Sequence, residues 1–164
     1  MVDGILEDKF EAFCAFRSIT KHECLGCGVH GSVWVVSDKQ NPAPWALKLL
    51  HRPQFYERER DCHIRLREQE VFCLQGFNVP QMLGFDDTWQ SVEMTIVRPP
   101  FVLDFAGAWL DEPPEFSADA WEMWEAEKRE QFEKDWPQAK KLLAALAGLG
   151  VHMMDVHPGN IMFR

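Results

Sequence analysis

Three glycines, Gly26, Gly28 and Gly31, follow one another in the order Gly-x-Gly-x-x-Gly, and this pattern restricts the fold more than any other feature. Glycine has no Cβ, so a loop of this kind lets the backbone come close to another group. The next residues, Ser32–Val36, are typical of a strand, and the short apolar run Trp45–Leu50 indicates a returning strand. The sequence therefore predicts a β-hairpin behind a glycine loop, whereas dinucleotide-binding folds place a helix after such a loop.

A single lysine, Lys48, lies in the middle of the returning strand. A charged side chain in a short apolar strand is costly unless it has a partner or snorkels to water from an edge strand. With a partner, its ammonium group could hold the phosphates of a nucleotide. We expect that partner to be a glutamate on the charged segment 54–75. This segment indicates one long helix, or a short helix followed by a longer one, ended by Asn78–Pro80. Glu70 is preferred for its distance from this break, and Glu68 is the alternative.

The remaining pattern adds further elements around the hairpin. Apolar residues at helical spacing predict an amphipathic helix over residues 5–18. Two more strands are expected at Met82–Phe85 and Val92–Val97. No internal repeat or low-complexity linker divides the chain, so the sequence predicts a single α+β domain over residues 1–164.

Two more helices are expected in the last third of the chain. Residues 111–135 are strongly acidic, and Ser117 is a candidate N-cap for a helix in this block. Its acidic face is either simply solvated or docks a partner. Residues 137–149 are apolar enough for a buried helix, with Pro137 in its first turn.

Composition narrows the classes of function and compartment. The formal net charge is −9, which argues against sequence-independent binding to nucleic acid. No apolar stretch approaches the roughly 20 residues of a membrane-spanning helix. The N-terminus lacks the basic and apolar regions of a secretory signal. We therefore expect a cytoplasmic protein that contacts neither nucleic acid nor membrane.

Five cysteines are present, an odd number that favours free thiols over a disulfide framework. Cys24 and Cys27 form a Cys-x-x-Cys motif flanked by His22 and His30. The motif could be half of a zinc site or a redox pair. Free thiols are the preferred interpretation, because a structural zinc site needs four well-placed ligands and the motif overlaps the glycine loop.

The strongest chemical signal is the segment Asp155–Asn160, with the sequence Asp-Val-His-Pro-Gly-Asn, ahead of the apolar Ile161–Phe163. An aspartate in such a loop can accept a proton from a substrate hydroxyl, and an asparagine supplies the oxygen ligand that Mg²⁺ prefers. Alternatively, both side chains could do no more than satisfy backbone turns. The order of the signals along the chain favours the catalytic interpretation.

Taken in this order, the signals from Glu23 to Phe163 resemble the protein-kinase-like superfamily. The Asp-x-His-Pro-Gly-Asn form is similar to atypical members, the lipopolysaccharide-type and aminoglycoside-like small-molecule kinases, as much as to ordinary Ser/Thr kinases. The resemblance implies a kinase-like N-lobe, an antiparallel sheet plus the αC helix, over about residues 1–100. A hinge and a minimal helical remnant of the C-lobe would follow over about 101–164.

The resemblance also implies a role for each matching residue. Lys48 would hold the phosphates of ATP, Glu70 would orient Lys48, and Asp155 and Asn160 would be the catalytic base and the Mg²⁺ ligand. The hinge would lie around Val97–Val102. The residues implied to surround the nucleotide are Gly26, Gly28, Gly31, Val33, Ala46 and Met162.

Two departures from the family pattern bear on activity. Met153-Met154 stands where kinases have His-Arg, and no Asp-Phe-Gly segment occurs before Arg164. Another carboxylate, such as Asp104 or one from the acidic helix, would have to replace the missing metal ligand. The function expected is ATP- and Mg²⁺-dependent phosphoryl transfer to a Ser/Thr or small-molecule hydroxyl. The alternative is an inactive pseudokinase that binds a nucleotide or docks a protein partner or a second copy.

Overall fold

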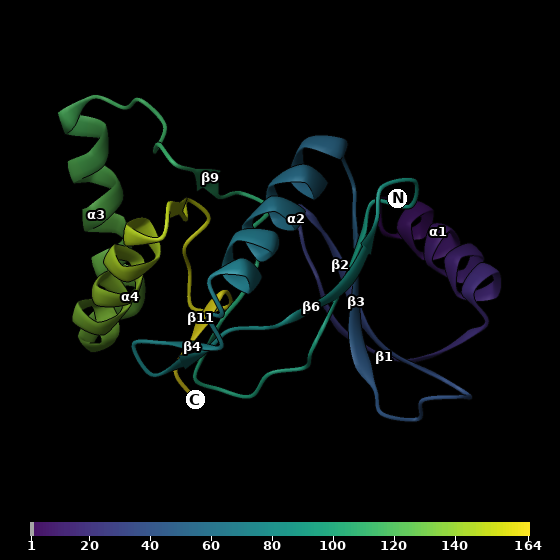
Figure 1. Cartoon of the computed structure of the whole chain (residues 1–164). Helices are drawn as coiled ribbons and strands as arrows, with labels where there is room; N and C mark the ends of the chain where they lie inside the picture. Colours follow the sequence, from purple (N-terminus) through teal and green to yellow (C-terminus); the bar gives the residue numbers. More distant parts are fainter. Residues whose placement is uncertain (1) are drawn as a thin grey trace.

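An antiparallel sheet forms the centre of the first half of the chain (Figure 1). The computed structural model describes residues 2–164, and the expected α+β class with a mostly antiparallel sheet is confirmed. All neighbouring strands of this sheet pair antiparallel. In spatial order the strands are β1 (Ile19–Cys27), β2 (Gly31–Asp38), β3 (Trp45–Leu50), β7 (Ser91–Met94) and β6 (Met82–Asp86).

The two faces of this sheet are covered by α1 (Val2–Arg17) and α2 (Pro53–Glu68), which lie on opposite sides of it (Figure 1). Successive side chains of a strand point to opposite faces. Trp45, Leu47 and Leu49 of β3 therefore share a buried cluster with α1. Ala46 and Leu50 share another with residues of α2. The same alternation turns Lys48 toward α2, so the lysine faces a helix rather than water.

Helix α1 covers the sheet through one apolar stripe. Leu6, Phe10, Phe13 and Cys14 are buried and spaced at helical intervals. The ring of Phe10 stacks on that of Trp34 with centroids 4.0 Å apart. Because each fully buried large apolar side chain contributes about 1.5–3 kcal/mol, this stripe holds the helix to the sheet. The amphipathic helix predicted for the N-terminal region is confirmed.

Helix α2 ends earlier than the sequence suggested. Its last residue is Glu68, and Glu70 adopts a left-handed backbone conformation with φ 54°. The N–H of Glu70 donates to the carbonyl of Arg67, and that of Val71 donates to the carbonyl of Leu66. These two bonds form a Schellman motif, which usually has glycine where Glu70 stands. The long helix predicted up to residue 75 was therefore wrong, and β4 (Cys73–Leu74) and β5 (Phe77–Asn78) follow the motif.

The last third of the chain packs as a second group of helices. It holds α3 (Ala118–Phe132), a single 3₁₀ turn η1 (Glu133–Asp135) and α4 (Trp136–Gly148). The Oγ of Ser117 accepts a hydrogen bond from the N–H of Ala120 at 3.2 Å, which confirms the predicted N-cap. Figure 1 shows α3 and α4 lying together, away from the five-stranded sheet. None of the helices within residues 2–164 combines the length and apolar character needed to span a bilayer.

Short strands connect the two groups of elements. β11 (Ile161–Met162), β8 (Phe101–Val102), β5 and β4 form one small sheet. β10 (Val151–His152) pairs with β9 (Trp109–Leu110). The loop between β10 and β11 carries Asp155 and Asn160, so the pairing of β11 with β8 anchors that loop at its C-terminal end.

Candidate functional site

Lys48 is held by two carboxylates although its side chain is only 5% exposed. Its Nζ lies 3.0 Å from Oε2 of Glu59 and 2.9 Å from Oδ1 of Asp104. The contact with Glu59 is an ion pair, since Oε2 receives no well-directed hydrogen bond. Burial alone would lower the pKa of Lys48, but attraction to Glu59 and Asp104 outweighs it and the pKa is raised. The ammonium group therefore stays charged inside the protein.

Glu59, and not Glu70 or Glu68, is the helix partner of Lys48. Glu70 occupies the Schellman position beyond the helix, and Glu68 is exposed on its last turn. Glu59 lies in the middle of α2, is 1% exposed and also lies 3.3 Å from Nε2 of His63. The pairing of Lys48 with Glu70 was therefore wrong, because the end of α2 lies beyond the stretch of helix that faces Lys48. Helical spacing could have identified Glu59 as the partner of Lys48. The buried face of α2 comprises Tyr56, Glu59, Cys62, His63 and Leu66.

Asp104 links the lysine to the glycine hairpin. Nδ1 of His30, which lies between β1 and β2, is 3.7 Å from Oδ1 of Asp104 and 3.5 Å from Oδ2 of Asp155. Burial would raise the pKa of Asp104, but Lys48 and His30 outweigh burial and lower it. Asp104 in turn raises the pKa of His30 against the opposing effect of burial, with a smaller contribution from Asp155. The ring of His30 packs edge-on against Phe55 with centroids 4.5 Å apart.

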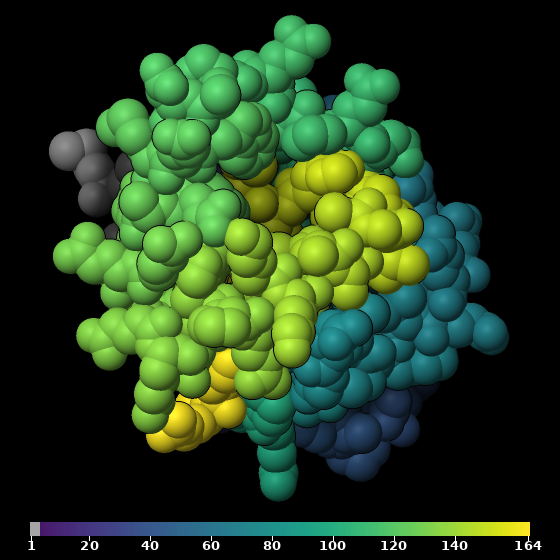
Figure 2. All heavy atoms as spheres, turned by 90° about the vertical axis from the view of Figure 1, so that its left-hand side faces the viewer, coloured from purple at the N-terminus to yellow at the C-terminus, as the bar shows by residue number. Residues whose placement is uncertain are grey.

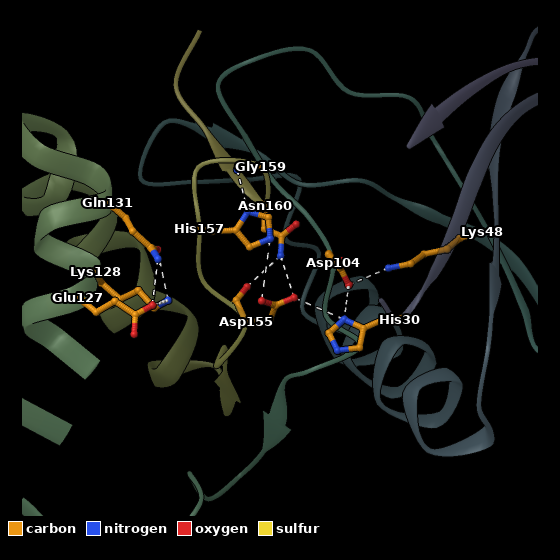
Figure 3. Close-up of polar contacts among 10 residues, drawn as sticks. All are labelled: His30, Lys48, Asp104, Glu127, Lys128, Gln131, Asp155, His157, Gly159 and Asn160. Atoms are coloured by element: carbon orange, nitrogen blue, oxygen red, sulfur yellow. Dashed lines mark hydrogen bonds and ion pairs between the residues drawn. The ribbon is translucent and has the colours of Figure 1, made fainter. Parts of the chain in front are cut away.

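Asp155 and Asn160 hold each other within the loop that joins β10 to β11. Nδ2 of Asn160 donates to the backbone carbonyl of Asp155 at 2.9 Å and lies 3.4 Å from its Oδ2. Oδ1 of Asn160 points away from Asp155 (Figure 3). The N–H of Leu103 donates to the carbonyl of Asn160 at 2.9 Å. This backbone bond ties the loop to the residue next to Asp104, so the loop and Asp104 are positioned together.

Figure 3 shows these groups converging in one place. The structure brings together Lys48, Asp155 and Asn160, which the sequence singled out, through Asp104 and His30. Asp104 was only one of several carboxylates considered, and His30 was weighed only as a neighbour of the Cys-x-x-Cys motif. No sequence signal identifies His30 as a cleft residue, because its place depends on how the hairpin folds over the helix.

The three glycines have different surroundings. A Cβ on Gly31 would collide with the backbone carbonyl of Leu49, so close packing of β2 on β3 requires glycine there. The N–H of Gly28 donates to the carbonyl of Gly31 at 2.9 Å and closes the turn. A Cβ on Gly26 would meet nothing within 4 Å, and one on Gly28 would only reach the carbonyl of Gly31 at 3.9 Å. Gly26 and Gly28 are therefore free of steric need within the chain and leave open space at the hairpin.

Three further residues implied for the nucleotide site lie in two different sheets. Val33 is directly opposite Lys48 in the β2–β3 register, so both side chains share one face. Ala46 is buried on that face, and Met162 is half-buried in β11.

The segment Val97–Val102, where a hinge is expected, uses several of its backbone groups in contacts within the protein. Val102 pairs with Ile161, and Phe101 pairs with both β11 and β5. The N–H of Asn78 donates to the carbonyl of Pro100 at 2.8 Å. The carbonyl of Arg98 also accepts a hydrogen bond, from Nδ2 of Asn78 at 2.8 Å, so these backbone groups are used within the protein.

One group of side chains could hold a metal ion. Ligand atoms of His30, Asp104 and Asp155 lie within 4.8 Å of one another, and no other three side chains of His, Cys, Asp and Glu do so among residues 4–164. The Cys-x-x-Cys motif lacks further ligands, since His22 contacts the hydroxyl of Ser37 and His30 faces the cleft. Carboxylates suit Mg²⁺, and an imidazole added to them also suits Mn²⁺ or Zn²⁺.

The site is thus a continuous path of charged groups from the buried face of α2 to the loop after β10. Comparison of the chain with models of known protein families finds no match. Comparison with curated proteins finds no related sequence either.

Proposed function

We propose that the chain is a protein-kinase-like domain that binds ATP with Mg²⁺ and transfers a phosphoryl group to a Ser/Thr or small-molecule hydroxyl. The observation that carries this proposal is the buried contact between Lys48 and Glu59. Asp104 and His30 link Lys48 to Asp155 (Figure 3). A buried ion pair is often no more stable than apolar residues of the same size. A function for the lysine, such as holding phosphate, explains its retention better than stability does.

The charges of the cleft favour a nucleotide that arrives with a cation. Glu59, Asp104 and Asp155 are three carboxylates against the one permanent positive charge of Lys48. A triphosphate alone would be repelled by this excess. Mg²⁺ would neutralise phosphate charge, and Asp104 and Asn160 offer the oxygen ligands it prefers. Binding should therefore depend on the metal.

Asp155 is the residue best placed to meet an acceptor. Its side chain is 41% exposed, unlike that of Glu59 or Asp104, so a hydroxyl can approach it from outside. Its carboxylate would take the proton of that hydroxyl as the oxygen attacks phosphorus. Asn160 holds the backbone of Asp155 in place. Asp104, which lies 2.9 Å from Nζ of Lys48, would supply the metal-binding carboxylate that the missing Asp-Phe-Gly segment provides in kinases.

Calorimetric titration with ATP, with and without Mg²⁺, tests the nucleotide site. We expect Mg²⁺-dependent binding that Lys48→Ala abolishes. Lys39→Ala is the matched control, because Lys39 is an exposed lysine in the turn after β2. Absence of binding at millimolar Mg²⁺-ATP would overturn the proposal.

Turnover is tested separately, with water as the phosphoryl acceptor. Asp155→Asn should leave Mg²⁺-ATP affinity within a few-fold of the wild type. It should lower ATP hydrolysis by about 10²–10⁴-fold, the usual contribution of a general base. If the wild type hydrolyses ATP and Asp155→Asn does so equally fast, the role assigned to Asp155 is wrong.

A second candidate function is an inactive scaffold of the same fold, favoured by an apolar groove. The groove has a volume of about 270 Å³ and lies beside α3 and α4. Figure 2 shows this face, which is hollowed between α3 and the segment that follows α4. The groove is lined chiefly by Trp121, Trp124, Trp136, Leu143 and Met153. A scaffold would bind nucleotide without hydrolysing it, and Asp155→Asn would then change nothing that can be measured.

A further inference from the structure

Cys24 and Cys27 are in contact, although they lie on the same strand. Their Sγ atoms are 3.3 Å apart. In a regular strand, residues three positions apart are separated by about 10 Å and point to opposite faces. The pairing of β1 with β2 shows two register shifts, between Lys21 and Cys24 and between Cys24 and Gly26. These bulges bend the strand and bring the two thiols together.

The pair is also accessible. Cys24 and Cys27 are both exposed, as is most of β1 from His22 onward. Among residues 2–164 they are the only two cysteines whose sulfur atoms are in contact. Cys14 and Cys62 are buried. A small reagent in solution can therefore reach both thiols of the pair.

We propose that Cys24 and Cys27 form a dithiol site that low-molecular-weight disulfides, such as oxidised glutathione, convert reversibly into an intramolecular disulfide. One cysteine thiolate attacks the small disulfide, forms a mixed disulfide and releases one small thiol. The second cysteine then attacks the protein sulfur of that bond and releases the other small thiol. The two protein thiols lose two protons and two electrons, and the small disulfide gains them.

The geometry requires little rearrangement. A disulfide bond is about 2.05 Å long, so the sulfur atoms have to approach by about 1.3 Å from their 3.3 Å separation. Rotation of two exposed side chains on a bulged strand can supply this. The second step is intramolecular, so it benefits from the high effective concentration of a neighbouring thiol.

The reaction should be slow at neutral pH and faster in alkali. Burial, and then the hydrogen bond with Cys27, raise the pKa of Cys24. Attack requires the thiolate, so the rate rises with pH. The pair therefore rests as two thiols in a reducing compartment, in keeping with a reversible rather than a structural disulfide.

Oxidation would act on the hairpin that carries the glycines. Cys27 is the last residue of β1 and directly precedes Gly28, and His30 at the end of the turn reaches the cleft. A disulfide would fix the bent end of β1 and reduce opening of this turn. The proposal does not depend on nucleotide binding, because it rests only on the position of the two thiols.

Intact and peptide mass spectrometry tests the proposal on the full chain. The chain is treated with oxidised glutathione at pH 8, its free thiols are alkylated, and it is digested with trypsin. Cleavage after Lys21 and Lys39 releases a peptide of residues 22–39 that contains Cys24 and Cys27 and no other cysteine. We expect this peptide to lose two hydrogens and carry no glutathione. Cys73, a single exposed thiol on another peptide, should carry glutathione and is the internal control.

Two variants and one structural readout complete the test. Cys24→Ser and Cys27→Ser should each leave a single glutathione adduct on the peptide. The Cys24–Cys27 disulfide should be reduced only when the ratio of reduced to oxidised glutathione is about tenfold or more above the ratio that releases glutathione from Cys73. Amide hydrogen exchange of residues 26–31 should slow on oxidation in the wild type and not in the variants. Two separate glutathione adducts on the wild-type peptide, or the stoichiometric recovery of zinc that Cys24→Ser removes, would overturn the proposal.

Discussion

Nζ of Lys48 lies 3.0 Å from Oε2 of Glu59, and both side chains are almost completely withdrawn from water. Burial by itself would raise the pKa of Glu59, but the nearby Lys48 ammonium outweighs it and lowers the pKa. Each charge is therefore tolerated because of the other. Removing one partner leaves an uncompensated charge, which costs more than the pair contributes when intact.

Glu59→Gln should lower the free energy of unfolding by about 1–3 kcal/mol, because it removes one of the two carboxylates that compensate the buried Lys48 and leaves only Asp104. Urea denaturation measures this loss. Glu70→Gln is the matched control and should change the same quantity by less than about 0.5 kcal/mol, since Glu70 is exposed beyond the helix. Equal losses in the two variants would show that Glu59 is not the partner of Lys48.

Gly31→Ala should reduce the stability of the fold, whereas Gly28→Ala should reduce nucleotide affinity. The first places a methyl group against the carbonyl of Leu49 and should cost about 1–3 kcal/mol of folding free energy, or more. The second meets open space, so thermal unfolding should be almost unchanged while Mg²⁺-ATP affinity falls. A Gly28→Ala variant with full nucleotide affinity would remove the loop from the proposed site.

The contribution of His30 to stability should depend on pH in one direction. Its folded-state pKa is raised above the ordinary value of 6.5, chiefly by Asp104, so folding favours the protonated ring. The resulting stabilisation is complete below pH 6.5 and is lost as the pH rises through the folded-state pKa. Urea denaturation of the wild type and His30→Asn, with a chelator present, should give a difference that shrinks from pH 5.5 to 8.5.

The difference in the free energy of unfolding between the wild type and His30→Asn should become smaller at every pH when Asp104→Asn is added to both proteins. A double-mutant cycle of this kind isolates the energy of the His30–Asp104 pair. A stabilisation by His30 that grew with pH would contradict the assignment.

Mn²⁺ should bind the group formed by His30, Asp104 and Asp155, whose ligand atoms converge. Electron paramagnetic resonance of free Mn²⁺ should report one site in the wild type. Affinity should fall by about tenfold or more in Asp104→Asn and in His30→Ala, since each removes a ligand atom. Glu122→Gln, which changes an exposed carboxylate of α3, should bind Mn²⁺ like the wild type, and an equal loss there would indicate diffuse binding to acidic surface.

Local patterns predicted the elements on which the site stands. The short apolar run around Lys48 predicted a returning strand of a hairpin, and β2 and β3 pair as expected. The cap at Ser117 also follows from its own side chain and the next three residues. These features depend on residues close in sequence, so the sequence carries enough information to predict them.

The predicted helix partner of Lys48 was wrong because the end of α2 was misplaced. Glu70 takes the left-handed position that glycine usually fills, so no glycine in the sequence indicated where α2 ends. Because the helix was predicted too long, Glu70 was preferred and Glu68 was the alternative, whereas Glu59 was not considered. Periodicity of the buried face, counted from Tyr56, would have selected the correct residue.

The places of His30 and Asp104 could not be predicted at all. Asp104 is 56 residues from Lys48, and its approach depends on how the segment after β8 crosses the cleft. His30 reaches Asp155 only because the hairpin leans over α2 and its ring rests on Phe55. Contacts between residues so far apart in sequence are decided by tertiary packing, which single-sequence patterns do not describe.

Helix α1 has a consequence for any shortened form of this protein. Without it, the sheet would present Trp34, Val36, Trp45, Leu47 and Leu49 to water as one continuous apolar face. Such a face is a ready template for stacking against another copy. A chain beginning at Ile19 would keep every residue of the cleft and still be expected to self-associate. Helix α1 therefore shields from water the apolar face of the sheet that lies opposite the face carrying Lys48.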